Sequence, residues 1–246
     1  MGLFGLRDPP SAGHRAPLVA RPDHESYCRN FTQDLPGLLS REISRHHDQV
    51  IDHYRALFRQ HSWLTDSLCW TVVQPLDEGI ALDDLLWRLN SGRDPEERVM
   101  DDPMEVAMDE DLALLYVFEG DGAYGFLEGR FGDSLPDELL AALSEDARVW
   151  TTSWGFNRTS TIAYAGGGRI RARIDNYVRG QQIDDVPEIF ADFPVMLDGL
   201  DREDLVGRQS AAFAFIEMAT GVGVEGDRLD GEGCRVIVLD TPALWP

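Results

Sequence analysis

The sequence contains no lysine, so all 22 basic residues among its 246 are arginine. A Walker A phosphate loop, a kinase phosphate-binding lysine, a pyridoxal Schiff base and a Ser-Lys dyad each require the lysine amine. The sequence therefore excludes these chemistries. A GC-rich genome that favours arginine codons also accounts for the absence, which for this reason carries no positive statement about function.

Cysteine and long apolar runs are scarce as well. Cys28, Cys69 and Cys234 lie far apart without paired spacing, so the sequence predicts neither a disulfide framework nor a zinc site. No other metal site and no cofactor is expected. The apolar start of the chain is too short for a signal peptide, and no run approaches the roughly 20 apolar residues that span a bilayer. We expect a cytoplasmic protein without a membrane partner.

Positive charge is the third deficit. The 22 basic residues face 44 acidic ones, which gives a formal net charge of −22. A polyanion of this kind repels phosphate at long range, so nucleic acid and anionic membrane surfaces are disfavoured as direct ligands. The field attracts cations, and we expect a basic protein or peptide as the partner.

Alternating apolar residues mark the clearest stretch of secondary structure, residues 147–175. Trp150, Thr152 and Trp154 share one face of a predicted strand, and the same alternation returns twice more before residue 175. Glycines at 166–168 suit a hairpin turn. With helical spacing elsewhere, this pattern predicts an α+β fold with a mostly antiparallel sheet packed on one face by helices.

Composition divides the chain into three parts. Residues 1–22 are rich in proline, glycine and alanine and are expected to form a flexible tail. Residues 23–64 have helical spacing and are expected to form an N-terminal helical arm. The α+β domain is expected over residues 65–246, with an exposed acidic loop at residues 94–111 that contains one helical turn at most.

Several short passages of the chain share a pattern with a known family. They are residues 68–73, 83–89, 127–129, 143–154, 157–165 and 220–222. Together they resemble an uncharacterised domain family, a domain of unknown function, of high-GC Gram-positive bacteria. The resemblance is best over residues 67–175, weaker to residue 239, and does not cover residues 1–60. Gly155 stands where the family pattern has asparagine, and no functional residues are implied by the resemblance.

The acidic loop is the first candidate site. As a concentrated negative surface, it could attract and orient a basic partner. The alternative is a solvated loop that serves solubility alone. The residues chosen as partner-binding are Asp101, Asp102, Asp109, Glu110 and Asp111.

A row of arginines is the second candidate. Arg169, Arg171 and Arg173 alternate along the third strand of the predicted meander, with Arg158 in a neighbouring turn. Such a row could bind a carboxylate-rich peptide or a phosphate. The alternative is that nearby threonines and carboxylates already occupy these side chains on an exposed sheet face.

A pair of glutamates is the only arrangement that suggests catalysis. Glu119 and Glu128 end two strands joined by a short hairpin, so we expect them within several ångströms of each other, as in a glycosidase. Glutamates at a sheet edge are nevertheless common, and no catalytic residue is assigned.

The leading hypothesis is a non-enzymatic, acidic protein-interaction module, for example an immunity or regulatory protein that masks a basic partner. The alternative is a hydrolase or small-ligand-binding protein that uses Glu119, Glu128 and the arginine row in a cleft. A structural subunit that forms homo-oligomers is a third hypothesis. The sequence does not decide the oligomeric state.

Overall fold

A computed structural model describes most of the chain in defined segments. The chain divides into two compact units, residues 1–42 and 43–246, and all contacts given below belong to the second. The predicted tail, residues 1–22, lies outside the described residues. Those residues are 38–77, 79–110, 112–120, 122–129, 134–157, 159–177, 190, 192–229 and 233–239.

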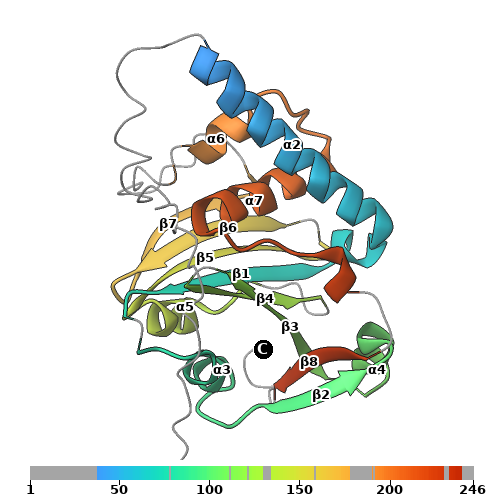
Figure 1. The fold of residues 1–246 in the computed structure, drawn as a ribbon, viewed down its shortest axis with the longest axis vertical. Coiled ribbons are helices and arrows are strands. Elements are labelled where there is room, and N and C mark those ends of the chain that lie inside the picture. The colour runs from blue at the N-terminus through green and yellow to red at the C-terminus, as the bar shows by residue number, and fades with distance from the viewer. Residues whose placement is uncertain are drawn as a thin grey trace, which may run out of the picture. The chain divides into compact units, whose positions relative to one another are not determined.

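Six α-helices, eight β-strands and two short 3-10 turns form in the described residues (Figure 1). In chain order they are α2 (Leu38–Gln60), η2 (Ser62–Thr65), β1 (Leu68–Pro75), α3 (Leu82–Leu89), β2 (Glu96–Met100), α4 (Pro103–Glu110), β3 (Ala113–Gly120), β4 (Ala123–Glu128), α5 (Asp137–Leu143), β5 (Ala147–Trp154), β6 (Ser160–Gly166), β7 (Ile170–Asp175), α6 (Asp192–Leu197), α7 (Leu205–Thr220), η4 (Gly226–Arg228) and β8 (Cys234–Leu239).

The eight strands form one sheet in the order β2-β8-β3-β4-β1-β5-β6-β7. Every adjacent pair is antiparallel, which confirms the α+β class with a mostly antiparallel sheet. The meander predicted within residues 147–175 is confirmed as β5, β6 and β7. Gly167 and Gly168 turn between β6 and β7 with φ values of +64° and +73°, which glycine adopts without steric cost.

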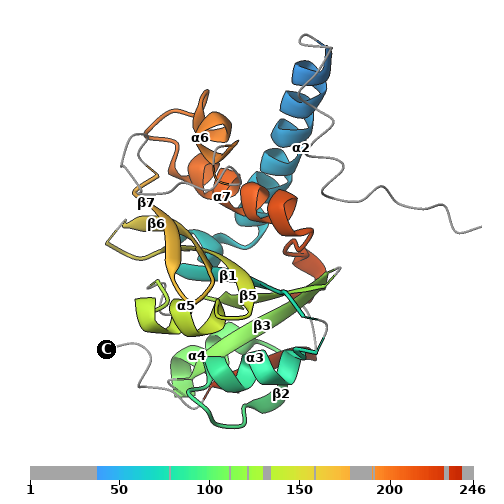
Figure 2. The same cartoon turned by 90° about the vertical axis from the view of Figure 1, so that its left-hand side faces the viewer.

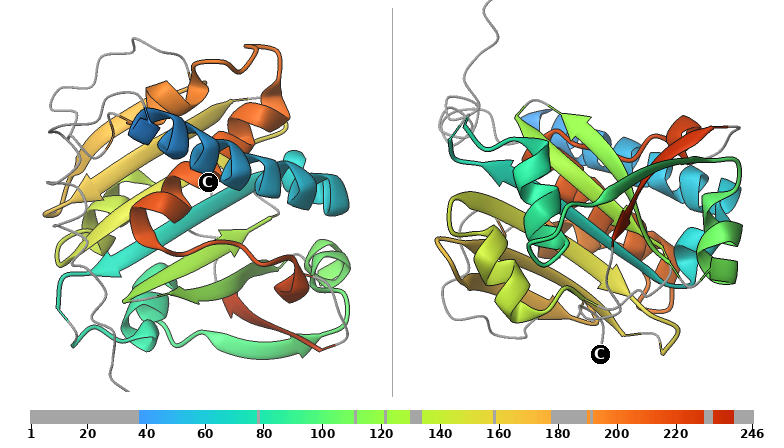
Figure 3. Two further views of the ribbon diagram at one scale, coloured as in Figure 1. Left: turned by 45° about the horizontal axis from the view of Figure 1, so that its top comes forward. Right: turned by 90° about the horizontal axis from the view of Figure 1, so that it is seen from below.

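Helices cover both faces of the sheet, whereas the sequence predicted helices on one face. Trp70 and Trp150 point to the face covered by α2 and α7, and Val73 and Val149 point to the face covered by α3 and α5. Figure 2 shows the sheet between these layers, and the right-hand view of Figure 3 shows α3 and α5 from below. Residues 68–73 of β1 are therefore buried without interruption, as is typical of a strand covered on both sides.

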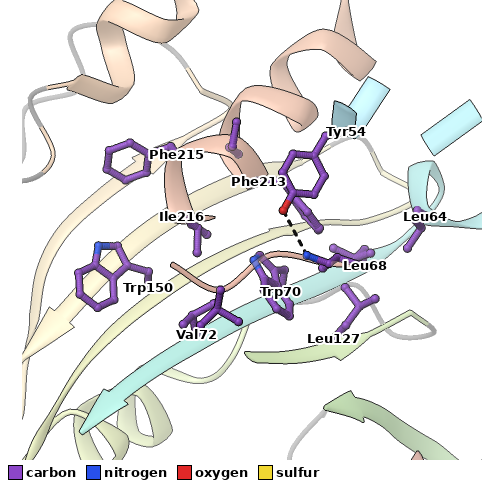
Figure 4. Close-up of a cluster of buried hydrophobic side chains, with 14 of the residues drawn as sticks. Tyr54, Leu64, Leu68, Trp70, Val72, Leu127, Trp150, Phe213, Phe215 and Ile216 are labelled. Carbon is purple, nitrogen blue, oxygen red and sulfur yellow. Dashed lines mark hydrogen bonds between the residues drawn. The ribbon is translucent and has the colours of Figure 1, made fainter. Parts of the chain in front are cut away.

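The second half of α2 belongs to the core rather than to an arm. Tyr54 and Phe58 each meet the Phe213 ring of α7 edge to face, with ring centroids 5.2 Å apart. Phe213 in turn stacks on Trp70 of β1 at 5.8 Å (Figure 4). Because these four rings are almost fully buried, the helix cannot be separated from the sheet without exposing a large apolar surface.

The segment expected to be an acidic loop is a strand followed by a helix. In β2, Glu97 lies opposite Ile237 of β8 and Met100 lies opposite Cys234. Met100 is buried, and so is Ala107 of α4. These contacts join residues more than 130 positions apart in the chain. Local composition shows the charge of the segment but not this distant strand partner, and so the sequence alone predicts a loop here.

Candidate functional site

Strand β2 and helix α4 present a dense group of carboxylates at one edge of the sheet. Eight acidic side chains lie between residues 94 and 110, against one basic side chain, Arg98. All eight are exposed. We call this group the acidic edge. Its members are Asp94, Glu96, Glu97, Asp101, Asp102, Glu105, Asp109 and Glu110.

The junction between β2 and α4 is fixed by two of these carboxylates. Asp102 Oδ1 accepts a hydrogen bond from the Glu105 amide at 3.1 Å and so satisfies a backbone donor in the first turn of α4. Asp101 Oδ1 accepts one from the Gly233 amide, also at 3.1 Å, beside the start of β8. The acidic edge therefore stands on ordered elements that are tied to the sheet.

Two arginines neutralise part of the acidic edge. Arg98 Nε donates to Glu96 at 2.9 Å, and its Nη1 lies 3.3 Å from Glu110. Hydrogen bonding to Arg98 lowers the pKa of the Glu96 carboxyl below its usual value. On the neighbouring strand, Arg235 Nη2 lies 2.6 Å from Glu97. Because such exposed ion pairs are individually weak, they hold side-chain geometry more than they stabilise the fold.

Five carboxylates of the acidic edge have no cationic partner in the described part of the chain. They come from the residues just before β2, its junction with α4 and α4 itself. Because the five residues are near one another in the chain, their negative charges reinforce one another. Their side chains are exposed and can be reached by a cation. These five are Asp94, Asp101, Asp102, Glu105 and Asp109.

The structure places four of the five predicted acidic residues in this edge. Asp101, Asp102 and Asp109 keep uncompensated charge, whereas Glu110 faces Arg98. Asp111 lies outside the described residues. Sequence reasoning did not single out Asp94 and Glu105, although both lie in the same acidic run and share the exposure of the others.

The arginines of the predicted row have different surroundings in the structure. Both terminal nitrogens of Arg173 donate to Asp137 at the start of α5, one of them at 3.3 Å. Arg171 Nε donates to the Gly166 carbonyl at 2.8 Å. Arg169 is exposed, and Arg158 lies outside the described residues. Two of the three guanidinium groups are thus already bonded within the protein, Arg173 to α5 and Arg171 to the end of β6.

Glu119 and Glu128 do not form a carboxylate pair. Glu119 lies opposite Tyr124, and Glu128 stands four residues further along the same strand, opposite Cys69. At about 3.4 Å per residue this separates the two positions by about 14 Å along the strand, beyond the ~5–9.5 Å of glycosidase pairs. Glu128 is also only 2 % exposed. The geometry expected for catalysis is absent at these two residues.

The sheet face beneath α5 contains a buried group of hydroxyls and a thiol. Thr71 and Thr151 lie opposite each other on β1 and β5, with their hydroxyl oxygens 2.8 Å apart. Cys69 Sγ lies 3.7 Å and 3.8 Å from these two oxygens. Burial raises the pKa of the Cys69 thiol to about 11, so it remains protonated at neutral pH and is a weak nucleophile.

A second buried polar group, also missed by sequence reasoning, surrounds Arg208 of α7. Its side chain donates to the carbonyl oxygens of Asn176 and Tyr177, both of which have positive φ values. The Tyr177 hydroxyl lies 2.7 Å from Thr152 Oγ1. Arg208 is 8 % exposed. An arginine within a largely apolar helix is the one sequence signal that marks this position.

No family model, curated protein or solved structure matches this chain. The resemblance to a domain of unknown function therefore stays a prediction. In the described residues, no three His, Cys, Asp or Glu side chains gather as metal ligands would. None of the helices described is both long and apolar enough to cross a bilayer.

Proposed function

We propose that this protein is a non-enzymatic interaction module that binds a basic protein or peptide through the acidic edge. In this role it masks the partner, as an immunity or regulatory protein would. The observation that carries the proposal is the group of five exposed carboxylates without a cationic partner among the described residues. Asp94 precedes β2, Asp101 and Asp102 lie at the junction between β2 and α4, and Glu105 and Asp109 lie on α4.

The placement of these carboxylates favours recognition of a folded or extended basic partner. The chain that carries them is joined to β2, which pairs within the sheet, and Asp101 and Asp102 accept hydrogen bonds from the amides of Gly233 and Glu105, so little ordering is needed when a partner binds. The net charge of −22 steers a cationic partner over a longer range. Carboxylates and arginines then form short, charge-assisted hydrogen bonds.

A pair of matched variants tests the proposal with a poly-arginine peptide of about 20 residues as the probe. The edge variant carries five neutral substitutions that keep hydrogen-bond acceptors at the caps. The remote variant carries five neutral substitutions at exposed acids elsewhere and has the same net charge. The edge substitutions are Asp94→Asn, Asp101→Asn, Asp102→Asn, Glu105→Gln and Asp109→Asn. The remote substitutions are Asp52→Asn, Asp66→Asn, Asp83→Asn, Glu138→Gln and Glu203→Gln.

Calorimetric titration at low ionic strength should show the edge variant binding the probe about tenfold or more weakly than the wild type. The remote variant should lose about twofold or less. Equal losses in the two variants would mean that binding follows total charge, and the acidic edge would not be the site. Circular dichroism of both variants checks that the fold is retained.

A further inference from the structure

Strand β2 is one end of the eight-stranded sheet, and its outer edge faces no other strand in the described part of the chain. On its inner side all five residues pair with β8, from Glu96 opposite Val238 to Met100 opposite Cys234. Antiparallel strands use alternate N–H and C=O groups on each side. The outward-pointing backbone groups of β2 are thus left without strand partners in the described residues.

Such an edge is a template for a further strand, and charge decides which strand it admits. Glu96 and Glu97 stand on β2 and are paired with Arg98 and Arg235. Asp94 and Asp101 flank the strand and have no cationic partner in the described residues, so the edge keeps a negative charge. A second copy of this chain that paired its β2 with this β2 would place like charges beside one another, which is unfavourable. A basic segment would be attracted, so charge at this edge disfavours β2–β2 pairing and favours a cationic strand.

The opposite end of the sheet differs in the sign of its charge. There β7 presents Arg171 and Arg173, which are bonded to the Gly166 carbonyl and to Asp137. A basic segment meets like charge on β7 and opposite charge on β2. The two ends of one sheet are therefore distinguishable by a basic partner.

We propose that an extended basic segment of the partner pairs with the outer edge of β2 as a ninth strand. This inference rests on the proposed function and names its binding mode. Side chains alternate across a strand, so those on one face of the added segment reach Glu97 and Val99. Those on the other face reach Glu96 and compete with Arg98 for its carboxylate. Val99 is 65 % exposed and offers an apolar contact between the carboxylates.

The test uses a peptide of about nine residues that alternates arginine and valine, and the same peptide methylated at every backbone nitrogen. Methylation keeps the side chains and the charge but removes the N–H donors that pairing needs. Affinity is measured with the full-length protein, together with the amide hydrogen exchange of residues 96–100 in the free and bound states.

We expect the methylated peptide to bind about tenfold or more weakly, and the unmethylated peptide to slow exchange of outward-pointing β2 amides about tenfold or more. Equal affinity of the two peptides, with unchanged exchange in β2, would overturn strand addition. If the two peptides bound equally well but both bound the edge variant more weakly than the wild type, the proposed function would stand and strand addition would not. If neither peptide bound at low ionic strength, both proposals would be wrong.

Discussion

Arg208 shows how a single buried residue fixes the chain where β7 ends. Two successive non-glycine residues, Asn176 and Tyr177, adopt left-handed backbone angles there, with φ values of 52° and 49°. Such angles are unfavourable unless surrounding contacts determine them. The guanidinium supplies those contacts by donating to both carbonyl groups.

Replacement of this residue should destabilise the whole fold. Arg208→Met keeps the length of the side chain but leaves the two carbonyls without their donor, so the free energy of unfolding should fall by about 2–3 kcal/mol. Arg208→Lys keeps one donor group and should lose less. Urea denaturation monitored by tryptophan fluorescence measures both variants. A Met variant within about 0.5 kcal/mol of the wild type would show that the turn holds without Arg208.

The sequence shows which positions are charged but not which groups surround them in the fold. The sequence placed Arg173 on an outward face, but Asp137 of α5 occupies it. The fold brings these two residues together across 36 positions of chain. Likewise, nothing near Arg208 in the sequence indicates that its partners are carbonyls more than 30 positions earlier. Alternation assigns a side chain to a face of the sheet, but only tertiary packing decides what covers that face.

Among the elements, helix α2 differs most from its prediction: the sequence predicts an arm, and the structure places the second half of the helix in the core. Phe58 is 2 % exposed and lies among aromatic rings of β5 and α7. Phe58→Ala should therefore lower the free energy of unfolding by about 3–5 kcal/mol, as expected for a cavity in a packed core. Arg59→Ala, at the neighbouring exposed position, is the matched control.

Chemical denaturation with both a fluorescence and a circular-dichroism readout decides the role of this helix. A core helix predicts one cooperative transition that shifts as a whole in Phe58→Ala. An independent arm predicts instead that the sheet unfolds at an unchanged denaturant concentration. The Arg59→Ala variant should stay within about 0.5 kcal/mol of the wild type.

The alternation of their own side chains predicts strands β5, β6 and β7, whereas nothing in the residues of β2 predicts a strand there. Residues 147–175 form a local meander whose strands pair with their neighbours in sequence, so the pattern was sufficient. Strand β2 pairs with β8 near the other end of the chain, and its exposed residues resemble a solvated loop. The helices over the second face were likewise unpredicted as a layer, because amphipathic spacing does not say which face of a sheet a helix covers.

For the whole molecule, composition predicts that the surface charge is negative but not where the unpaired carboxylates lie. The net charge of −22 favours a basic partner whichever carboxylates it meets. Which carboxylates remain uncompensated depends on where the few arginines fall in space. Arg235 pairs with Glu97 across 138 positions of chain, and only the folded structure shows this pair.

We propose that the partner meets the acidic edge rather than the acidic surface at large. Carbodiimide-dependent labelling of carboxyl groups tests it directly in the wild-type protein, with and without the poly-arginine probe. Our account predicts that labelling of Asp94, Asp101 and Asp109 slows about fivefold or more in the complex, while exposed acids elsewhere, such as Asp52 and Glu138, are labelled at unchanged rates. Uniform protection of all exposed carboxyls, or protection confined to those outside the edge, would contradict it.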